Sequence, residues 1–328
     1  MLFKKIVSFI AYLVVITMIV FLSGEISLRL FYPILKNQNT EMWRYAAEIK
    51  KPLDVPELPF YHYEKRRGNY AGVEIKTNSF GFRDREYAKK KPPQTKRILF
   101  VGDSFTLGWG VPMENTYAKR IEKLLNQSAN HYEVINMGVG NYNTSMELAL
   151  LKLKGLTLSP DSIVLFYFIN DAESTPTISR LGRSFLKYSY FLNFCCDIFL
   201  QWCLRWNKNL TLENHYQKLY APAGDAFNKT REALLEFIRI CKTNHIKLLI
   251  VSIPELGRLK NYPFDFATRF VEQISGAQST PFLDLLPFLK NHSRENLWIS
   301  QKDGHANSFA NTLIAETVYW KMKEVGMF

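Results

Sequence analysis

Residues 97–105 read RILFVGDSF, and this stretch decides how the rest of the chain is interpreted. It opens with a short apolar run that ends in glycine, the pattern of a buried strand in a parallel sheet. An aspartate and a serine follow directly, where such a strand gives way to a helix. The stretch therefore predicts a strand over Arg97–Gly102, with Ser104 at the start of the next helix.

Downstream of this strand, apolar runs of strand length alternate with segments of helical periodicity. Strands that alternate with helices predict an α/β fold, in which a central parallel sheet lies between two layers of helices. Strands are predicted at Tyr132–Met137, Ser162–Ile169, Lys247–Ile253 and Pro281–Leu286, and helices at Tyr117–Asn126, Ser145–Gly155, Thr230–Thr243, Ala267–Ser275 and Phe309–Lys323.

Polar residues follow the first three predicted strands at their carboxyl ends, where open α/β sheets bind ligands. Ser104 comes after the first, the segment from Gly138 through Gly140 to Asn141 after the second, and Asn170 after the third. A backbone N–H at a helix start, a glycine-rich turn and an Asn amide can each stabilise an oxyanion. Each also suits an ordinary turn or helix cap, and this alternative stays open.

A fourth polar site, Asp303-Gly-His305, leads into the last predicted helix. A serine hydroxyl needs a base to become a nucleophile, and histidine is the usual one. A nearby carboxylate can fix the imidazole tautomer and stabilise its cation. The chain has only six histidines, and this one has a carboxylate two residues away. Further clustered His, Cys or Asp ligands are missing from the sequence pattern, so we expect neither a metal nor a cofactor.

Together, and in this order, the four sites resemble the SGNH (GDSL-like) hydrolase family. The resemblance runs from Arg97 to the C-terminus and rests on VGDSFTLGWGV and DGHAN. It implies a three-layer, flavodoxin-like sandwich in which Ser104 is the nucleophile and an oxyanion donor. It further implies that Asn170 is the second donor, His305 the general base and Asp303 the group that orients it.

The sequence departs from the family pattern at three points. Asn141 occupies the position at which the family usually has the glycine that supplies an oxyanion amide. The backbone N–H that donates to the oxyanion is therefore expected from Gly138, Gly140 or Asn141. Phe168 replaces the usual glycine of the third block. Asp303 and His305 are separated by one residue where two are common, and this spacing bears on the role of Asp303.

The N-terminal segment predicts a membrane anchor. Residues 6–22 carry no charge and are long enough to cross the hydrocarbon core as a helix. Lys4 and Lys5 precede them, which places the N-terminus in the cytoplasm and the rest of the chain outside. A cleaved signal peptide is the alternative, although no A-x-A-like site follows. We expect a single-pass protein of the cytoplasmic membrane with a periplasmic or extracellular catalytic domain.

Three parts are predicted: an anchor over 1–32, an extended arm or small cap over 33–95, and a catalytic domain over 96–328. Within the arm, Thr77–Asp84 has turn chemistry suited to docking on the main domain. An insertion at about 172–226 is rich in aromatic residues and is interpreted as packed helices, or as a substrate-covering cap that touches the membrane. Its Cys195, Cys196 and Cys203, like Cys241, leave disulfide formation open.

Composition narrows the function further. With 47% hydrophobic residues the chain can build a large core, and its net charge of +12 is compatible with an anionic membrane or glycan. No nucleic-acid-binding motif accompanies that charge. The sequence predicts a serine esterase acting on O-acyl esters of cell-envelope glycans, or on lipid esters. The alternatives are an O-acetyltransferase of the same mechanism and a non-catalytic glycan-binding protein that works with polysaccharide-biosynthesis partners.

Overall fold

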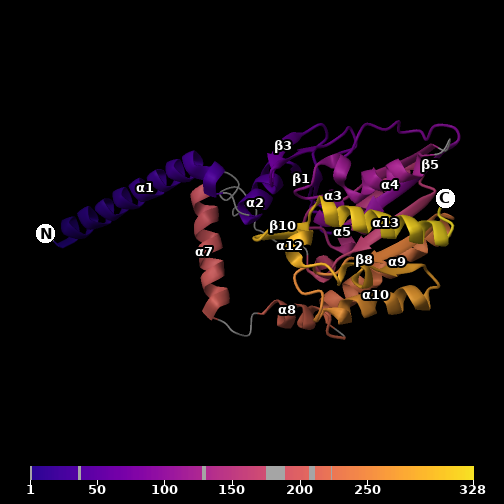
Figure 1. Cartoon of the computed structure of the whole chain (residues 1–328). Coiled ribbons are helices and arrows are strands. Elements are labelled where there is room, and N and C mark those ends of the chain that lie inside the picture. Colours follow the sequence, from indigo (N-terminus) through magenta and orange to yellow (C-terminus); the bar gives the residue numbers. More distant parts are fainter. Residues whose placement is uncertain (1, 36–37, 128–130, 175–188, 207–210, 223) are drawn as a thin grey trace. The chain divides into compact units, whose positions relative to one another are not determined.

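A computed structural model describes the chain apart from residues 1, 36–37, 128–130, 175–188, 207–210 and 223 (Figure 1). It divides into two compact units. One consists of Met1–Ala47 with Thr177–Asn209, and the other of Glu48–Pro176 with Leu210–Phe328. Parts of the predicted aromatic-rich insertion fall on the residues outside the description, so the insertion is visible only in its described helices.

The second unit is built on a five-stranded parallel sheet of order β6-β5-β7-β8-β9. This confirms the predicted α/β fold and all five predicted strands. The order is that of a flavodoxin-like sheet, with the chain reversing its direction of growth beside β5. The strands are β5 (Thr95–Val101), β6 (His131–Asn136), β7 (Ser162–Tyr167), β8 (Lys247–Ser252) and β9 (Phe282–Asp284).

Helices cover both faces of this sheet because every strand is apolar on both sides. In β5, Leu99 and Val101 enter one core cluster while Ile98 and Phe100 enter the other, as the two-residue period of a strand requires. The first cluster is completed by α5 (Thr144–Leu153), α9 (Asp225–Thr243) and α10 (Asp265–Ala277), and the second by α4 (Tyr117–Leu125) and α13 (Ser308–Glu324).

Shorter elements connect the strands and helices of this unit. These elements are α3 (Ser104–Leu107), η1 (Met113–Asn115), η2 (Gly155–Leu158), η3 (Ile169–Ala172), α8 (Leu212–Leu219), α11 (Leu286–Leu289), α12 (Arg294–Leu297), β10 (Trp298–Ser300) and β11 (Asp303–Ala306). The last two, β10 and β11, form an antiparallel pair that was not predicted from the sequence.

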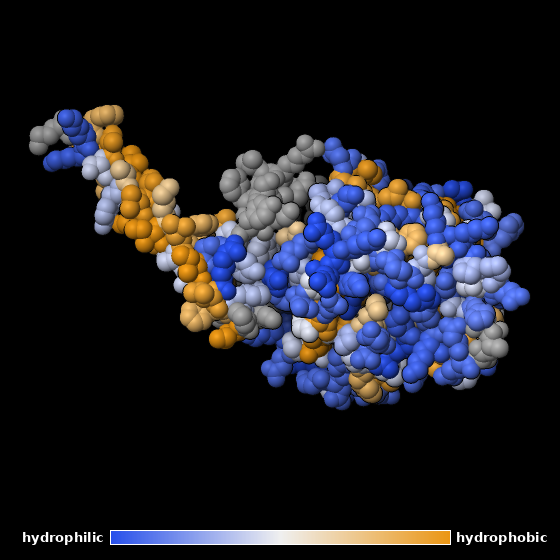
Figure 2. All heavy atoms as spheres, turned by 90° about the horizontal axis from the view of Figure 1, so that it is seen from above, coloured by the Kyte–Doolittle hydropathy of each residue, from blue (hydrophilic) through white to orange (hydrophobic). Residues whose placement is uncertain are grey.

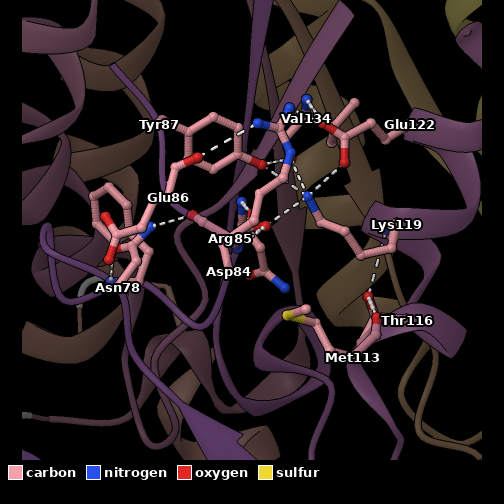
Figure 3. Close-up of polar contacts among 12 residues, drawn as sticks. Asn78, Asp84, Arg85, Glu86, Tyr87, Met113, Thr116, Lys119, Glu122 and Val134 are labelled. Atoms are coloured by element: carbon pink, nitrogen blue, oxygen red, sulfur yellow. Dashed lines mark hydrogen bonds and ion pairs between the residues drawn. The ribbon is translucent and has the colours of Figure 1, made fainter. Parts of the chain in front are cut away.

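Residues 48–95 belong to the same unit as the sheet and contain two hairpins. These pair β1 (Lys50–Pro52) with β2 (Phe60–His62), and β3 (Arg67–Tyr70) with β4 (Val73–Lys76). The turn that follows docks on the sheet domain through buried polar groups (Figure 3). Asp84 forms a 2.6 Å ion pair with Lys119 of α4, and Tyr87 donates a 3.1 Å hydrogen bond to the Val134 carbonyl of β6.

The first unit contains α1 (Leu2–Leu35), α7 (Tyr190–Trp206) and most of α2 (Gln38–Glu48). Among the described helices, α1 alone is long and apolar enough to cross a membrane. Figure 2 shows its surface as a continuous hydrophobic band. Side chains along its uncharged run are exposed, as Val15, Met18 and Leu22 show.

Candidate active site

The reversal of strand order beside β5 determines where the predicted site residues meet. Because β5 and β7 are neighbours that run parallel, their carboxyl ends lie at the same edge of the sheet. Ser104 begins α3 three residues after the end of β5, and Asn170 lies in η3 three residues after the end of β7. Ser104 is the first residue of its helix, so its N–H has no carbonyl partner within that helix.

Three predicted residues form one continuous chain of hydrogen bonds. The Oγ atom of Ser104 lies 2.9 Å from Nε2 of His305, and Nδ1 of the same ring lies 2.6 Å from Oδ1 of Asp303. All three are largely buried. This arrangement places a base on the serine hydroxyl and a carboxylate on the far side of that base.

The short spacing between Asp303 and His305 follows from the strand that carries them. Successive side chains of a strand alternate between its faces, so residues two apart point the same way. Because Asp303 and His305 lie in β11, a single intervening residue brings their side chains together. The backbone N–H of His305 also donates to Asp303 Oδ1 at 3.1 Å, which fixes the carboxylate from a second direction.

Trp109 completes the surroundings of Asp303, a contact that the sequence analysis did not predict. Its indole Nε1 donates a 3.0 Å hydrogen bond to Asp303 Oδ2, so each carboxylate oxygen has its own donor. Burial opposes ionisation of Asp303, but the hydrogen bonds from His305 and Trp109 outweigh it and hold its pKa below the ordinary value. Asp303 therefore stays negatively charged beside the imidazole.

Asn170 lies beside the serine turn. Its side chain hydrogen-bonds Asp103, the residue that caps α3 by accepting from the Phe105 N–H at 2.8 Å. The Oδ1 atom of Asn170 is buried and has no hydrogen-bond partner among the described residues. The predicted second oxyanion donor is thus brought to the serine, with its amide directed at Asp103 in this structure.

The segment after β6 departs from ordinary backbone geometry at Asn141. Its φ of 63° lies in the left-handed region, which asparagine tolerates better than most residues. Gly138 is needed for a different reason: a Cβ there would lie 2.1 Å from the backbone nitrogen of Leu107. Gly138 therefore lets this segment pack against α3, and Gly140 precedes the left-handed turn.

Lys50 fixes the orientation of this segment, although its sequence context gave no indication of it. Its Nζ donates to the Gly140 carbonyl at 2.5 Å and to Asn141 Oδ1 at 3.0 Å. In a trans peptide the carbonyl and the next N–H point in opposite directions. Lys50 therefore turns the Asn141 N–H away from itself. Burial lowers the pKa of Lys50 to about 7.

Arg83 supports the serine from the other end of α3. Its guanidinium is buried and donates to the carbonyls of Leu107 at 3.0 Å and Gly108 at 2.5 Å. These carbonyls close a four-residue helix that is too short to be stable alone. The predicted docking segment thus braces the helix that begins with Ser104.

Two buried carboxyls lie near Asp103 and take no part in the Ser–His–Asp chain. Both oxygens of Glu147 and Oδ1 of Asp171 are buried without a hydrogen-bond partner among the described residues. Burial, and then the charge of nearby carboxylates, raises the pKa of each well above its ordinary value. Among the described residues, groups of three or more His, Cys, Asp or Glu side chains arranged for a metal were not found.

Comparison with known proteins gives similarities of fold. No family model and no curated protein sequence matches the chain. Similar solved structures include TesA (TM-score 0.47, 14% identity, covering 70% of this chain and 99% of that one). Another is the acetyl xylan esterase AlAXEase (TM-score 0.46, 18% identity, covering 70% of this chain and 98% of that one). A third is a GDSL-like lipase from Bacteroides thetaiotaomicron (TM-score 0.42, 14% identity, covering 70% of this chain and 89% of that one). At such identities the similarity concerns backbone arrangement, and chemistry must be judged from the side chains.

Proposed function

We propose that this protein is a serine esterase that cleaves O-acyl esters through an acyl-enzyme. The observation that carries the proposal is the unbroken chain from Asp303 through His305 to Ser104, with separations of 2.6 and 2.9 Å. A buried serine hydroxyl gains little from a histidine and a carboxylate aligned in this order unless its proton is to be removed. Acyl transfer is the reaction class that uses this alignment.

In the first half-reaction, Ser104 Oγ forms a bond to the ester carbonyl carbon as its proton moves to His305 Nε2. The carbonyl electron pair shifts to oxygen, where the Ser104 N–H, the Asn141 N–H and the Asn170 amide are the proposed donors. The intermediate collapses, the ester C–O bond breaks, and the imidazolium returns its proton to the leaving alcohol. Asp303, held ionised by its donors, stabilises that imidazolium.

The second half-reaction reverses these steps with water. His305 removes a proton from water as the water oxygen attacks the acyl carbon, and the Ser104 ester bond then breaks. A carboxylic acid is released and the serine hydroxyl is restored. If a sugar hydroxyl replaces water, the same residues perform O-acetyl transfer, which is the alternative function.

Aromatic rings limit the space around His305. The ring centroids of Phe105 and Trp109 lie 5.3 and 6.1 Å from that of the His305 ring.

The substrate proposal follows from the N-terminal helix. We propose that α1 spans the cytoplasmic membrane with Lys4 and Lys5 inside, so that the site works on the periplasmic or extracellular side. Substrates there include acylated polymers of the envelope. A proposed acetylated glycan fits this location, and proteins of envelope polysaccharide biosynthesis are the proposed partners.

The test measures acetate released from an acetylated oligosaccharide and from a simple aryl acetate by the full-length protein in detergent. We expect hydrolysis by wild-type protein and a loss of at least about 10³-fold in kcat for Ser104→Ala. Ser145→Ala, a serine in the first turn of α5, is the matched control and should keep full activity. An absence of hydrolysis by folded wild-type protein would favour the non-catalytic glycan-binding alternative.

Adding an unacetylated oligosaccharide to the same assay separates the esterase from the transferase. A transferase would form acetylated sugar, and the partition of acetyl groups between sugar and water would follow the acceptor concentration. An esterase would release the same acetate at every acceptor concentration.

A further inference from the structure

Helix α7 docks on α1 where the uncharged run of that helix ends. Glu25 of α1 accepts hydrogen bonds from Ser189 Oγ at 2.8 Å and from the N–H groups of Tyr190 at 3.2 Å and Phe191 at 2.9 Å. The first N–H groups of a helix lack partners within it, so Glu25 caps α7 across the two helices. The beginning of α7 is thereby tied to one level of α1.

Apolar contacts reinforce this joint. The ring of Phe191 packs edge-on against Phe21 with centroids 5.7 Å apart. It also lies so near Gly24 that a Cβ there would come within 2.5 Å of the ring. Glycine is therefore required for this approach. The hydrogen bonds and ring contacts come from Ser189 and the first two residues of α7, and the helix then runs away from α1 (Figure 1).

The joint lies where the uncharged run of α1 ends. Glu25 and Arg29 are the first charged residues after the uncharged run. Just beyond them, Tyr190 is surrounded by the rings of Tyr32 and Trp43 at 5.0 and 5.2 Å, with the Arg29 guanidinium 5.0 Å from its centre. Tyrosine, tryptophan and arginine gather in this way at the boundary between hydrocarbon and water.

The apolar face of α7 continues from this joint. Residues three, seven and eleven positions after Phe191 share its face of the helix, and they are Phe194, Ile198 and Trp202. Phe194 is 38% exposed, Ile198 53% and the adjacent Phe199 64%. Asp197 points away from this face and accepts a 2.5 Å hydrogen bond from Asn39 of α2. We call Phe194, Cys195, Ile198, Phe199 and Trp202 the α7 stripe.

We propose that the α7 stripe is embedded in the outer interface of the lipid bilayer, so that α7 lies in the membrane surface beside the anchor. This inference rests on the proposed role of α1 as a membrane span. The stripe lies on the same face of α7 as Phe191, the residue that packs against Phe21 of α1. Amphipathic helices with aromatic and aliphatic residues on one face bind at this depth.

The two adjacent cysteines of α7 provide a built-in test. Cys195 lies within the stripe, whereas Cys196 is turned about 200° from Phe194 around the helix. Both are exposed in the structure. Two full-length variants, each keeping one of these thiols with the other three cysteines replaced by serine, are reconstituted in vesicles. An environment-sensitive fluorophore is attached to the remaining thiol, and quenching by lipids brominated on their acyl chains is measured.

We expect brominated lipid to quench the label at position 195 at least about threefold more than the label at position 196. The label at 195 should also be shielded from iodide in the water. Equal quenching at both positions would overturn the proposal. Shielding from iodide without quenching by lipid would overturn it as well, because it would show that protein covers the stripe.

A third variant separates this inference from the anchor on which it rests. Val15→Cys, in a chain whose four native cysteines are serine, places a label in the middle of the uncharged run of α1. If position 15 is quenched by lipid and position 195 is not, the α7 proposal fails while the anchor stands. If neither is quenched, the anchor itself is wrong. Wild-type rates of aryl acetate hydrolysis in all three variants show that the catalytic unit is folded.

Discussion

Two adjacent lysines, Lys50 and Lys51, have different structural roles. Because successive side chains of a strand alternate between its two faces, the side chains of Lys50 and Lys51 point to opposite faces of β1. Lys50 is buried and donates to Gly140 and Asn141, while Lys51 lies over the Tyr61 ring at the surface. The proposed oxyanion donor at Asn141 thus depends on a lysine about ninety residues earlier in the chain.

Replacing Lys50 should reduce catalysis more than substrate binding. Lys50→Met keeps the length and apolar stem but removes both hydrogen bonds to the Gly140–Asn141 turn, so the proposed Asn141 donor loses its fixed direction. We expect kcat for aryl acetate to fall about 10²-fold with little change in KM, in line with the loss of one oxyanion donor. Lys51→Met is the matched control and should behave as wild type. Equal kcat values for the two variants would remove Lys50 from this role.

Glu147 predicts a pH dependence of stability. Burial, then the charge of Asp103, raises its pKa well above the ordinary 4.5, so folded protein keeps a proton that the unfolded chain has released. Stability should therefore fall as pH rises from the unfolded pKa to the folded one, by about 1.4 kcal/mol per pH unit. Glu147→Gln lacks this titration.

Urea unfolding in detergent at pH 5 and pH 8 compares wild type, Glu147→Gln and the exposed Glu232→Gln on α9. Relative to wild type, Glu147→Gln should gain stability between the two pH values, whereas Glu232→Gln should follow wild type. If Glu147→Gln also follows wild type, Glu147 is ionised in the folded state.

Site residues that belong to a local sequence motif could be predicted, whereas those that act through contacts with distant parts of the chain could not. Ser104, Asn170 and His305 were predictable because each follows a recognisable strand end or motif. Lys50, Arg83 and Trp109 were not, because their roles are hydrogen bonds to distant backbone or side chains, and lysine, arginine and tryptophan occur throughout the chain. Whether Asp303 could reach His305 across a single residue could be judged only from the structure, since the sequence around β11 has no strand pattern that would have predicted it.

Secondary-structure elements hold the site together through close backbone approach. The β6–α5 connection passes against α3 at Gly138, and Arg83 closes the other end of α3. All five strands were predicted because buried parallel strands are continuous apolar runs. Helix α9 begins at Asp225, five residues before its predicted start at Thr230. The prediction missed this first turn because the polar run from Asn228 to Glu232 separates Phe227 from the apolar periodicity that begins at Ala233.

Gly138→Ala should dislodge the helix that carries Ser104. The new Cβ would lie 2.1 Å from the Leu107 nitrogen and 2.5 Å from the Thr106 carbonyl carbon, and backbone atoms cannot move aside cheaply. We expect a loss of about 3 kcal/mol or more in unfolding free energy, together with loss of ester hydrolysis. Urea unfolding of the purified protein measures the first quantity.

Gly276→Ala is the matched control for this substitution. Gly276 lies exposed in α10 with no atom within 4 Å of an added Cβ, so alanine should leave activity intact and add up to about 1 kcal/mol of stability. If Gly138→Ala unfolds at the same urea concentration as wild type, the connection after β6 does not press on α3 as the structure indicates.

At the scale of the whole molecule, α1 is described as one helix to Leu35, and its residues 21–32 take part in binding α7. A signal peptide removed after residue 22 or 23 would delete part of that joint. The uncleaved anchor therefore stays a proposal that cleavage of the chain can test.

We expect the chain to remain in bacterial membranes after a carbonate wash, with the mass of the uncleaved protein. Its C-terminal part should be digested by protease added to spheroplasts, from outside. Replacing Lys4 and Lys5 by Glu should reduce this accessibility, because positive charges hold the N-terminus in the cytoplasm. A soluble, shortened product would show instead that the segment is a signal peptide.

The central claim is that Ser104 is an activated nucleophile, and covalent labelling with a fluorophosphonate tests it most directly. Wild-type protein should incorporate one phosphonyl group, located on Ser104 by mass spectrometry of its peptide. His305→Ala should react at least about 10²-fold more slowly, because the base that removes the proton is gone. A folded wild-type protein that is not labelled, or is labelled at another serine, would contradict the account.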